Sequence, residues 1–408
     1  MIEHPLRRAL DAETHARPSV AVNAPATIFH LALIGVSSSE TELDARLTAI
    51  GGKLLHRTDR QAVCETPSGR LKWERHSEFV TWTLFIEGNP GESSPPLWWS
   101  DFDGECVTSL EVAIAPRAEG EVAITECSEE LARSSVSGGF ATVQSDFRIG
   151  QSGRTLIKIE LNGDDPPRFG RLIRRLIELE TYRNVALLGL PVAQEALRAL
   201  DQLEADLRRV SGGMPAVSDN AADAQLLTDL TTLAARLERV RCDVSFRLGA
   251  SDAYAALFAQ RIVELREERI EGSERISVFL NRRFAPAMAT CASLTRRLDA
   301  AGLRIDRVSA LLRTRVDVAV ERQNSALLTS MNERAAAQLR LQQAVEGLSV
   351  FAIAYYLTGL LERPLAALSE YWPWLDAPLI PALIAIAAVA GIWFGVRRLK
   401  KELPAPQP

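Results

Sequence analysis

Residues 377–396 read APLIPALIAIAAVAGIWFGV, a stretch of 20 residues without a charged side chain. At a helical rise of about 1.5 Å per residue, such a stretch spans the roughly 30 Å hydrocarbon core of a bilayer. A shorter uncharged segment at residues 347–361 reaches similar length only by continuing past Glu362-Arg363-Pro364 to residue 368. The sequence therefore predicts two membrane spans, at about 347–368 and 377–396.

Charged residues set the expected orientation of these spans. A basic cluster follows the second span directly, and such clusters stay on the cytoplasmic side of a bacterial inner membrane; it consists of Arg397, Arg398, Lys400 and Lys401. The N-terminus lacks the apolar segment of a secretory signal, so the body is also expected in the cytoplasm. Two ends on one side require two crossings, which predicts a C-terminal transmembrane helical hairpin. Tyr371, Trp372 and Trp374 between the spans fit an interfacial aromatic belt.

Small residues mark one face of the second span. Ala387, Gly391 and Gly395 recur every four residues, a spacing that lets transmembrane helices approach closely. This face could pack on the first span of the same chain or on another subunit. The first span contributes further residues to the predicted anchor, namely Gly347, Tyr355, Tyr356 and Gly359.

The N-terminal part of the chain has the pattern of an α+β domain with a mainly antiparallel sheet. Short stretches of strand character are separated by Gly, Pro and Ser, and one early helix is expected over residues 40–50. The predicted strands cover residues 27–36, 62–66, 70–73, 79–87, 106–115, 138–149 and 155–161.

Long helices follow Pro166-Pro167. The periodicity predicts helices at 168–188, 192–210, 221–246 and 252–270, and another from about residue 273. The last carries an apolar seam of coiled-coil type, which loosens at Arg315; the seam consists of Leu294, Leu298, Ala301, Ile305, Val308 and Leu312. No proline interrupts residues 287–363, which predicts a stalk leading into the first span.

These patterns predict three domains: an α+β domain at 1–165, a helical bundle and stalk at 166–345, and the hairpin with its basic tail at 346–400. The stalk seam must be buried, either against helices of the same chain or against the same seam in another subunit. We favour a homo-oligomer slightly, because the small-residue face of the second span offers a further contact.

Five segments resemble a family of membrane-anchored bacterial proteins catalogued as domain of unknown function 3422. They are HPLRRALDAETHARP at 4–18, LKWERHSEF at 71–79, SDFRI at 145–149, RLIELETYRNVALLGLP at 175–191 and the long stretch LLRTRVDVAVERQNSALLTSMNERAAAQLRLQQAVEGLSVFAIAYY at 311–356. The resemblance covers nearly the whole chain. It implies membrane attachment and supplies no catalytic residue.

Net charge, cysteine spacing and the motifs present argue against several classes of function. A net charge of −5 argues against nucleic acid as a partner, since nucleic-acid binding requires clustered positive charge. The five cysteines form no CxxC pair, and no phosphate-binding loop or nucleophile elbow is present, so no cofactor is evident and an enzyme has little support.

A metal site is the main alternative to a structural role for the histidines. His4, His15, His76 and Glu74 offer imidazole and carboxylate ligands, but their spacing matches no known motif. Hydrogen-bonded structural histidines are favoured. Glu180, Tyr182 and Arg183 are expected to form a buried polar network that joins the two domains. The basic cluster at residues 168–175 is expected to be a solvated helical face.

The leading hypothesis is a membrane-anchored interaction or scaffold protein, whose cytoplasmic body binds an unknown protein partner while the hairpin sits in the lipid bilayer. The alternative is a CorA-like divalent-cation channel, which shares the outline of a soluble domain, a stalk and two spans. The channel hypothesis lacks support from sequence, because the Gly-Met-Asn signature of CorA-type channels is replaced here by Tyr355-Tyr356-Leu357-Thr358-Gly359.

Overall fold

The computed structural model describes residues 3–8, 11, 19–36, 40–91, 93–116, 131–212, 220–369 and 380–402. The chain divides into two compact units. The first consists of Met1–Met214 and Ala224–Ser309, and the second of Pro215–Asp223 and Ala310–Pro408. The first unit combines a sheet with helices, so the predicted α+β class is confirmed. The predicted boundaries near residues 165 and 345 stay predictions.

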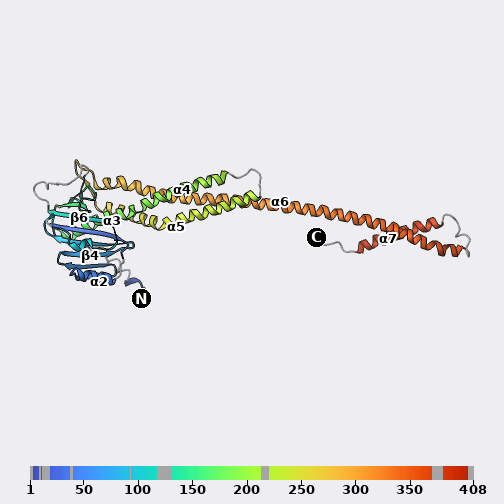
Figure 1. Cartoon of the computed structure of the whole chain (residues 1–408), viewed down its shortest axis with the longest axis horizontal. Coiled ribbons are helices and arrows are strands. Elements are labelled where there is room, and N and C mark those ends of the chain that lie inside the picture. Colours follow the sequence, from blue (N-terminus) through green and yellow to red (C-terminus); the bar gives the residue numbers. More distant parts are fainter. Residues whose placement is uncertain are drawn as a thin grey trace. The chain divides into compact units, whose positions relative to one another are not determined.

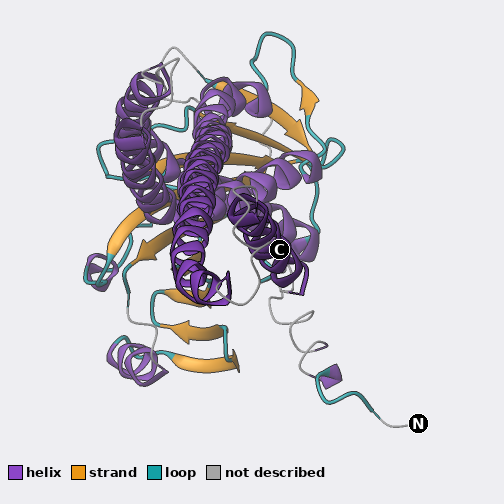
Figure 2. Cartoon of the chain, turned by 90° about the vertical axis from the view of Figure 1, so that its right-hand side faces the viewer, coloured by secondary structure: helices purple, strands orange, loops and turns teal. Residues whose placement is uncertain are grey.

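The described strands form one ten-stranded sheet, in which they lie side by side (Figure 2). Their order is β10-β7-β8-β9-β6-β1-β5-β4-β3-β2, and every neighbouring pair is antiparallel except β6 and β9. The mainly antiparallel sheet was therefore predicted correctly. The bounds are β1 Ala26–Ile34, β2 Lys53–Thr58, β3 Gln61–Thr66, β4 Gly69–Arg75, β5 Phe79–Glu87, β6 Glu105–Pro116, β7 Ala132–Val136, β8 Ala141–Ser145, β9 Thr155–Leu161 and β10 Glu268–Arg269.

The sequence prediction missed β2, β7 and β10. β10 lies within the helix predicted at 252–270, which ends at Glu264 instead. β2 is an edge strand whose side chains are exposed or half-buried, so it shows no alternation of apolar and polar residues. β7 reads ARSSV and buries its first serine, Ser134, which removes the apolar contrast that marks a strand. The strand predicted at 138–149 is shorter, since Gly138 and Gly139 form a turn with φ of +67° and +79°.

The central strand β1 is buried on both faces. Ile28 and Ala32 face a core shared with helix α3 (Pro166–Leu187). Phe29, Leu31 and Leu33 face a second core, which is covered by helix α2 (Glu40–Ala49) and by Trp99 of the 3-10 helix η1 (Leu97–Ser100). The sheet therefore packs helices against both faces, a layered arrangement that buries the apolar side chains of each.

The segment before β1 lies directly on α3. A Cβ added at Gly170 would stand 2.0 Å from the carbonyl oxygen of Val20, so only glycine allows this approach. The amide of Val22 also donates to the carbonyl oxygen of Pro166. Asp165 caps the same end of α3 by accepting a hydrogen bond from the backbone amide of Arg168.

Four longer helices follow α3: α4 Gly189–Gly212, α5 Asn220–Glu264, α6 Ile276–Ser369 and α7 Ile380–Glu402. The predicted division of α5 near residues 247–251 was wrong, because no proline occurs there and Ser251 is buried within a continuous helix. The expected break at Gly189-Leu190-Pro191 falls at Leu188 instead, since proline is tolerated in the first turn of α4. The predicted aromatic belt residues Tyr371, Trp372 and Trp374 lie outside the described residues.

Within the first unit, α4, α5 and the N-terminal part of α6 run alongside one another (Figure 1). Ion pairs join them: Arg297 of α6 reaches Asp201 and Glu204 of α4 at 2.6 and 2.9 Å, and Arg236 of α5 reaches Asp206 of α4 at 2.9 Å. These pairs fix the register of three helices whose apolar faces meet.

The apolar seam of α6 is buried within its own chain. Leu294, Leu298, Ala301, Ile305 and Leu312 are at most 7% exposed, and Val308 is half-buried. Facing helices supply buried leucines of their own: Leu200, Leu203 and Leu207 from α4, and Leu230, Leu233 and Leu237 from α5. Because one chain already covers the seam, the seam no longer argues for a homo-oligomer, which stays an untested prediction.

An ion pair explains why the seam loosens at Arg315. In the second unit, Arg315 Nε lies 3.3 Å from Asp223 Oδ2, and Asp223 is fully buried. A guanidinium therefore occupies the position where a seam residue was expected, and it neutralises a carboxylate from the start of α5.

Candidate functional site

The residues that offered a metal site as the alternative do not come together in the described part of the chain. His4 is exposed near the N-terminus, and His15 lies outside the described residues. Glu74 Oε1 forms an ion pair with Lys72 Nζ at 2.9 Å. The His76 ring stacks on the Phe79 ring, with the two ring centroids 4.2 Å apart. Among the described residues, no three His, Cys, Asp or Glu side chains form a group that could hold a metal ion.

A histidine that was not among those candidates is the most buried one. His30 of β1 is 2% exposed, and its ring nitrogens lie 2.8 Å from Thr83 Oγ1 on β5 and 3.2 Å from Thr181 Oγ1 on α3. Burial, together with the positive charges of His76 and Lys72, lowers the pKa of His30 from 6.5 to about 3. His30 is thus a neutral structural histidine that links the sheet to α3.

The carboxylate of Glu180 centres a second polar group on the same helix. It is 1% exposed, accepts a hydrogen bond from Arg183 Nε at 2.9 Å and lies 3.4 Å from the amide nitrogen of Asn184. Asn184 in turn donates to Thr108 Oγ1 of β6 at 3.1 Å. Burial lowers the pKa of Arg183, but the charge and hydrogen bond of Glu180 outweigh this and raise it. The polar network predicted from sequence is therefore present for Glu180 and Arg183 and connects α3 to the sheet, whereas the Tyr182 ring packs against Tyr254 in the apolar core.

A chain of ion pairs extends from α3 to α5. Glu178 of α3 pairs with Arg174 at 2.7 Å and with Arg261 of α5, and Arg261 also pairs with Glu264 at 2.9 Å. Arg175 reaches Glu264 at 3.5 Å. The prediction of a solvated basic face was therefore wrong for Arg174 and Arg175, which are half-buried and paired with Glu178 of α3 and Glu264 of α5, respectively.

The polar side chains between α3, the sheet and α5 have partners within the chain, so this interface is a structural element more than a ligand site. His30 is saturated by two hydroxyls, and the carboxylates of Glu178 and Glu180 are each held by arginine. A catalytic acid or base needs a free face that a substrate can reach. The interface instead joins β1, β5, β6, α3 and α5 within the first unit.

Comparison with known protein families identifies the family of this chain. A family model described as "Protein of unknown function (DUF3422)" matches residues 2–403. The chain belongs to that family. The resemblance predicted from sequence is confirmed, and no curated protein matches the chain. Two segments that carry the DUF3422 resemblance, residues 71–79 and 175–191, supply Lys72, Glu74, His76, Glu178 and Glu180 to the interface between sheet and helix.

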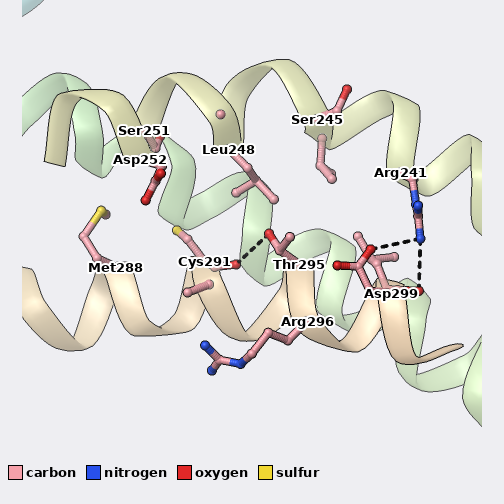
Figure 3. Close-up of a pocket in the computed structure, with 14 residues that line it drawn as sticks. Arg241, Ser245, Leu248, Ser251, Asp252, Met288, Cys291, Thr295, Arg296 and Asp299 are labelled. Carbon is pink, nitrogen blue, oxygen red and sulfur yellow. Dashed lines mark hydrogen bonds and ion pairs between the residues drawn. The ribbon is translucent and has the colours of Figure 1, made fainter. Parts of the chain in front are cut away.

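An open groove lies between α5 and α6 in this DUF3422 protein (Figure 3). Its volume is about 530 Å³. One wall carries Leu248 and Asp252 of α5, and the facing wall carries Met288, Cys291 and Thr295 of α6. At one end Arg241 of α5 forms an ion pair with Asp299 of α6 at 3.2 Å. The groove thus combines apolar walls with charged ends.

The floor of this groove depends on one close helix contact. A Cβ added at Gly189, the first residue of α4, would lie 2.4 Å from Ser251 Oγ and 3.6 Å from Cys291 Sγ. Glycine at this position lets α4 approach the two walls. Sequence reading missed the groove, because its two walls are more than 30 residues apart and each follows ordinary helical periodicity.

The C-terminal part of α6 has an apolar surface that no described element covers. Within the described residues, α6 is the one helix long and apolar enough to cross a membrane, and only 6% of its most apolar window is buried. Leu348, Phe351, Tyr355, Tyr356 and Leu360 are each more than 70% exposed. In α7 the described apolar stretch, Ala385–Gly395, is shorter.

The remaining predicted anchor residues lie on these two helices. The predicted interruption at Pro364 does not end α6, which continues to Ser369. Ala387, Gly391 and Gly395 are exposed on α7, and a Cβ at Gly347, Gly359, Gly391 or Gly395 would meet open space. The small-residue face is thus unoccupied by described side chains. The basic residues Arg397, Arg398, Lys400 and Lys401 fall in the last turns of α7.

Proposed function

We propose that this protein is a membrane-anchored interaction protein. The apolar end of α6 and helix α7 enter the bilayer as a hairpin, and the first unit binds a protein partner on the cytoplasmic side. The observation that carries the proposal is the exposed apolar surface of α6. Each large apolar side chain left in water forfeits roughly 1.5 to 3 kcal/mol, so a surface of this size requires an apolar environment.

The orientation rests on charge and on helix direction. α7 runs opposite to the end of α6 (Figure 1), as a hairpin requires. The basic residues at the end of α7 favour the cytoplasmic side. An even number of crossings then returns α6 to that side, so the residues upstream of the first span share the cytoplasm with the C-terminal tail.

The groove between α5 and α6 is the surface that we propose for the partner. α4, α5 and α6 already form three sides of a helical bundle, and an amphipathic helix laid between Leu248 and Met288 would complete a fourth. Asp252 and Arg296 border the groove, and neither makes an ion pair with another described residue. These charges would orient the incoming helix.

Photo-cross-linking in native membranes tests this function. A photoreactive amino acid at Ser245, which lines the groove, is expected to give a discrete adduct with one other polypeptide. The same group at Arg239, which is exposed on α5 but does not line the groove, is the matched control and should give none. Filling the groove by Ala292→Trp should abolish the Ser245 adduct.

Equal adducts from both positions would contradict a specific partner site. The absence of any adduct, combined with Mg²⁺ flux by the purified protein in lipid vesicles, would replace the interaction function with the channel alternative. Flux would need polar groups facing a shared axis within the spans.

The pH dependence of folding tests the structural role of His30. The folded state keeps His30 neutral down to a pH of about 3, whereas the unfolded chain binds a proton near pH 6.5. The unfolded state therefore binds more protons below pH 6.5, and stability falls as the pH decreases. Between pH 7 and 5 we expect a loss of about 2 kcal/mol from this group.

Denaturant unfolding across this pH range measures the loss. His30→Gln, which keeps a neutral hydrogen-bonding side chain, should flatten the dependence, whereas His56→Gln on exposed β2 should preserve it. Identical slopes for the His30 variant and the wild type would show that His30 does not govern the acid sensitivity.

A further inference from the structure

A second hollow lies in the first unit, on the face of the sheet opposite α3. It has a volume of about 300 Å³, and it is lined by outward-facing residues of β6, β8 and β9 and by the loop after β5. Its apolar part consists of Pro90, Ala113, Ala115 and Leu156. The hollow exists because the side chains of Ala113 and Ala115 are short, whereas neighbouring residues on the same face carry longer side chains.

The polar part of the hollow contains one uncompensated positive charge. Lys158 of β9 is half-buried and makes no hydrogen bond or ion pair with any residue that the structure describes. The two carboxylates that line the hollow are already paired: Glu111 with Arg154 at 3.1 Å, and Glu160 with Arg133 at 3.4 Å. With these pairs neutralised, the ammonium group leaves a net charge of +1 at the hollow.

An unsatisfied amide stands beside this ammonium. Gln144 of β8 lines the hollow and is 4% exposed, and its amide nitrogen has no hydrogen-bond partner among the described residues. Gln144 is the direct cross-strand partner of Lys158, which places the two side chains on one face with Cβ atoms about 5 Å apart. An unpaired buried amide is unfavourable, and a bound acceptor would remove this penalty.

We propose that this hollow binds a carboxylate group. The carboxylate would form a charge-assisted hydrogen bond with Lys158 and accept a second from the amide of Gln144. The part of the ligand next to the carboxylate would lie on Ala113, Ala115 and Leu156. The volume is at the lower end of the range for small-molecule sites, which suits a short ligand or the last residue of a peptide.

Titration of the detergent-solubilised full-length protein tests the proposal. Benzoate is expected to bind in a saturable manner, observed by saturation-transfer NMR, whereas the isosteric but uncharged benzamide should bind at least tenfold more weakly. N-acetyl-Ala-Ala-Leu with a free C-terminus, compared with its C-terminal amide, distinguishes a peptide terminus from a small acid as the source of the carboxylate. Inorganic phosphate serves as the competing anion.

Two substitutions examine the contacts directly. Lys158→Met keeps the aliphatic stem and should weaken benzoate binding at least tenfold, and Gln144→Leu should weaken it by a smaller factor. Lys53→Met on exposed β2 is the matched control and should bind like the wild type. The melting temperature of each variant shows whether the fold is retained.

Three outcomes overturn the proposal: equal binding of benzoate and benzamide, unchanged affinity in a folded Lys158→Met variant, or no saturable binding of either carboxylate probe. Phosphate displacing benzoate at lower concentration would assign the hollow to phosphate instead. None of these results bears on membrane attachment or on the groove between α5 and α6, so the proposed function is tested separately.

Discussion

Removal of residues 347–408 is expected to release the chain from the membrane fraction into the soluble fraction. The deletion takes away the apolar end of α6 and all of α7 and leaves the first unit intact. Sedimentation of lysate membranes at high salt, followed by immunoblotting, measures the partition. We expect a change from almost wholly sedimented to almost wholly soluble.

The size of this effect follows from the exposed side chains of α6. Leu348, Phe351, Ile353, Leu357 and Leu360 are 40–75% exposed, and their transfer to hydrocarbon contributes on the order of 10 kcal/mol. Helix α7 adds to this value. A free energy of this size changes the partition coefficient between membrane and water by many powers of ten. A salt-sensitive surface contact would not match this effect.

A pair of double substitutions supplies the matched control. Phe351→Asp with Leu360→Asp places charges inside the proposed span, where each costs about 3 kcal/mol, and should weaken membrane retention. Leu327→Asp with Leu339→Asp changes two leucines that are 58% and 59% exposed on the same helix but lie upstream of the span, and retention should be unchanged.

Retention of the deleted chain at high salt would refute anchoring by these helices. Reporter fusions check the orientation independently. A reporter at residue 408 should signal cytoplasm, and one between residues 369 and 376 should signal periplasm. A periplasmic signal at residue 408 would exclude the hairpin.

Glu180→Ala is expected to destabilise the first unit by about 3–4 kcal/mol. The substitution removes a carboxylate that is 1% exposed and leaves Arg183, itself largely buried, without its partner. Asn184 also loses an acceptor. An uncompensated buried guanidinium is the costly element, because its desolvation is no longer offset by an adjacent negative charge. Urea unfolding followed by circular dichroism measures the change.

The double variant Glu180→Met with Arg183→Met separates charge from packing. It replaces the ion pair with apolar side chains of similar length, and we expect it to be more stable than Glu180→Ala alone. Glu195→Ala, at an exposed position on α4, should change stability by less than about 0.5 kcal/mol. If Glu180→Ala were as mild as Glu195→Ala, the buried pair would not contribute to the fold.

The sequence by itself determined the α+β class, the mainly antiparallel sheet, the long helices and the family. It also determined the apolar segments near the C-terminus. These features depend on local periodicity: β6 alternates buried and half-buried residues along its length, and residues 347–361 lack charge altogether. A pattern of this kind is present in the chain before any contact forms.

Only the tertiary structure decided which polar residues meet. His30 and Thr181 are 151 residues apart, and Lys158 and Gln144 become neighbours only through the pairing of β8 with β9. The stalk seam shows the same limit, since the period of Leu294 and Leu298 indicates that they are buried but not what covers them. Periodicity fixes which face of an element is apolar, whereas the partner of that face depends on how distant elements pack.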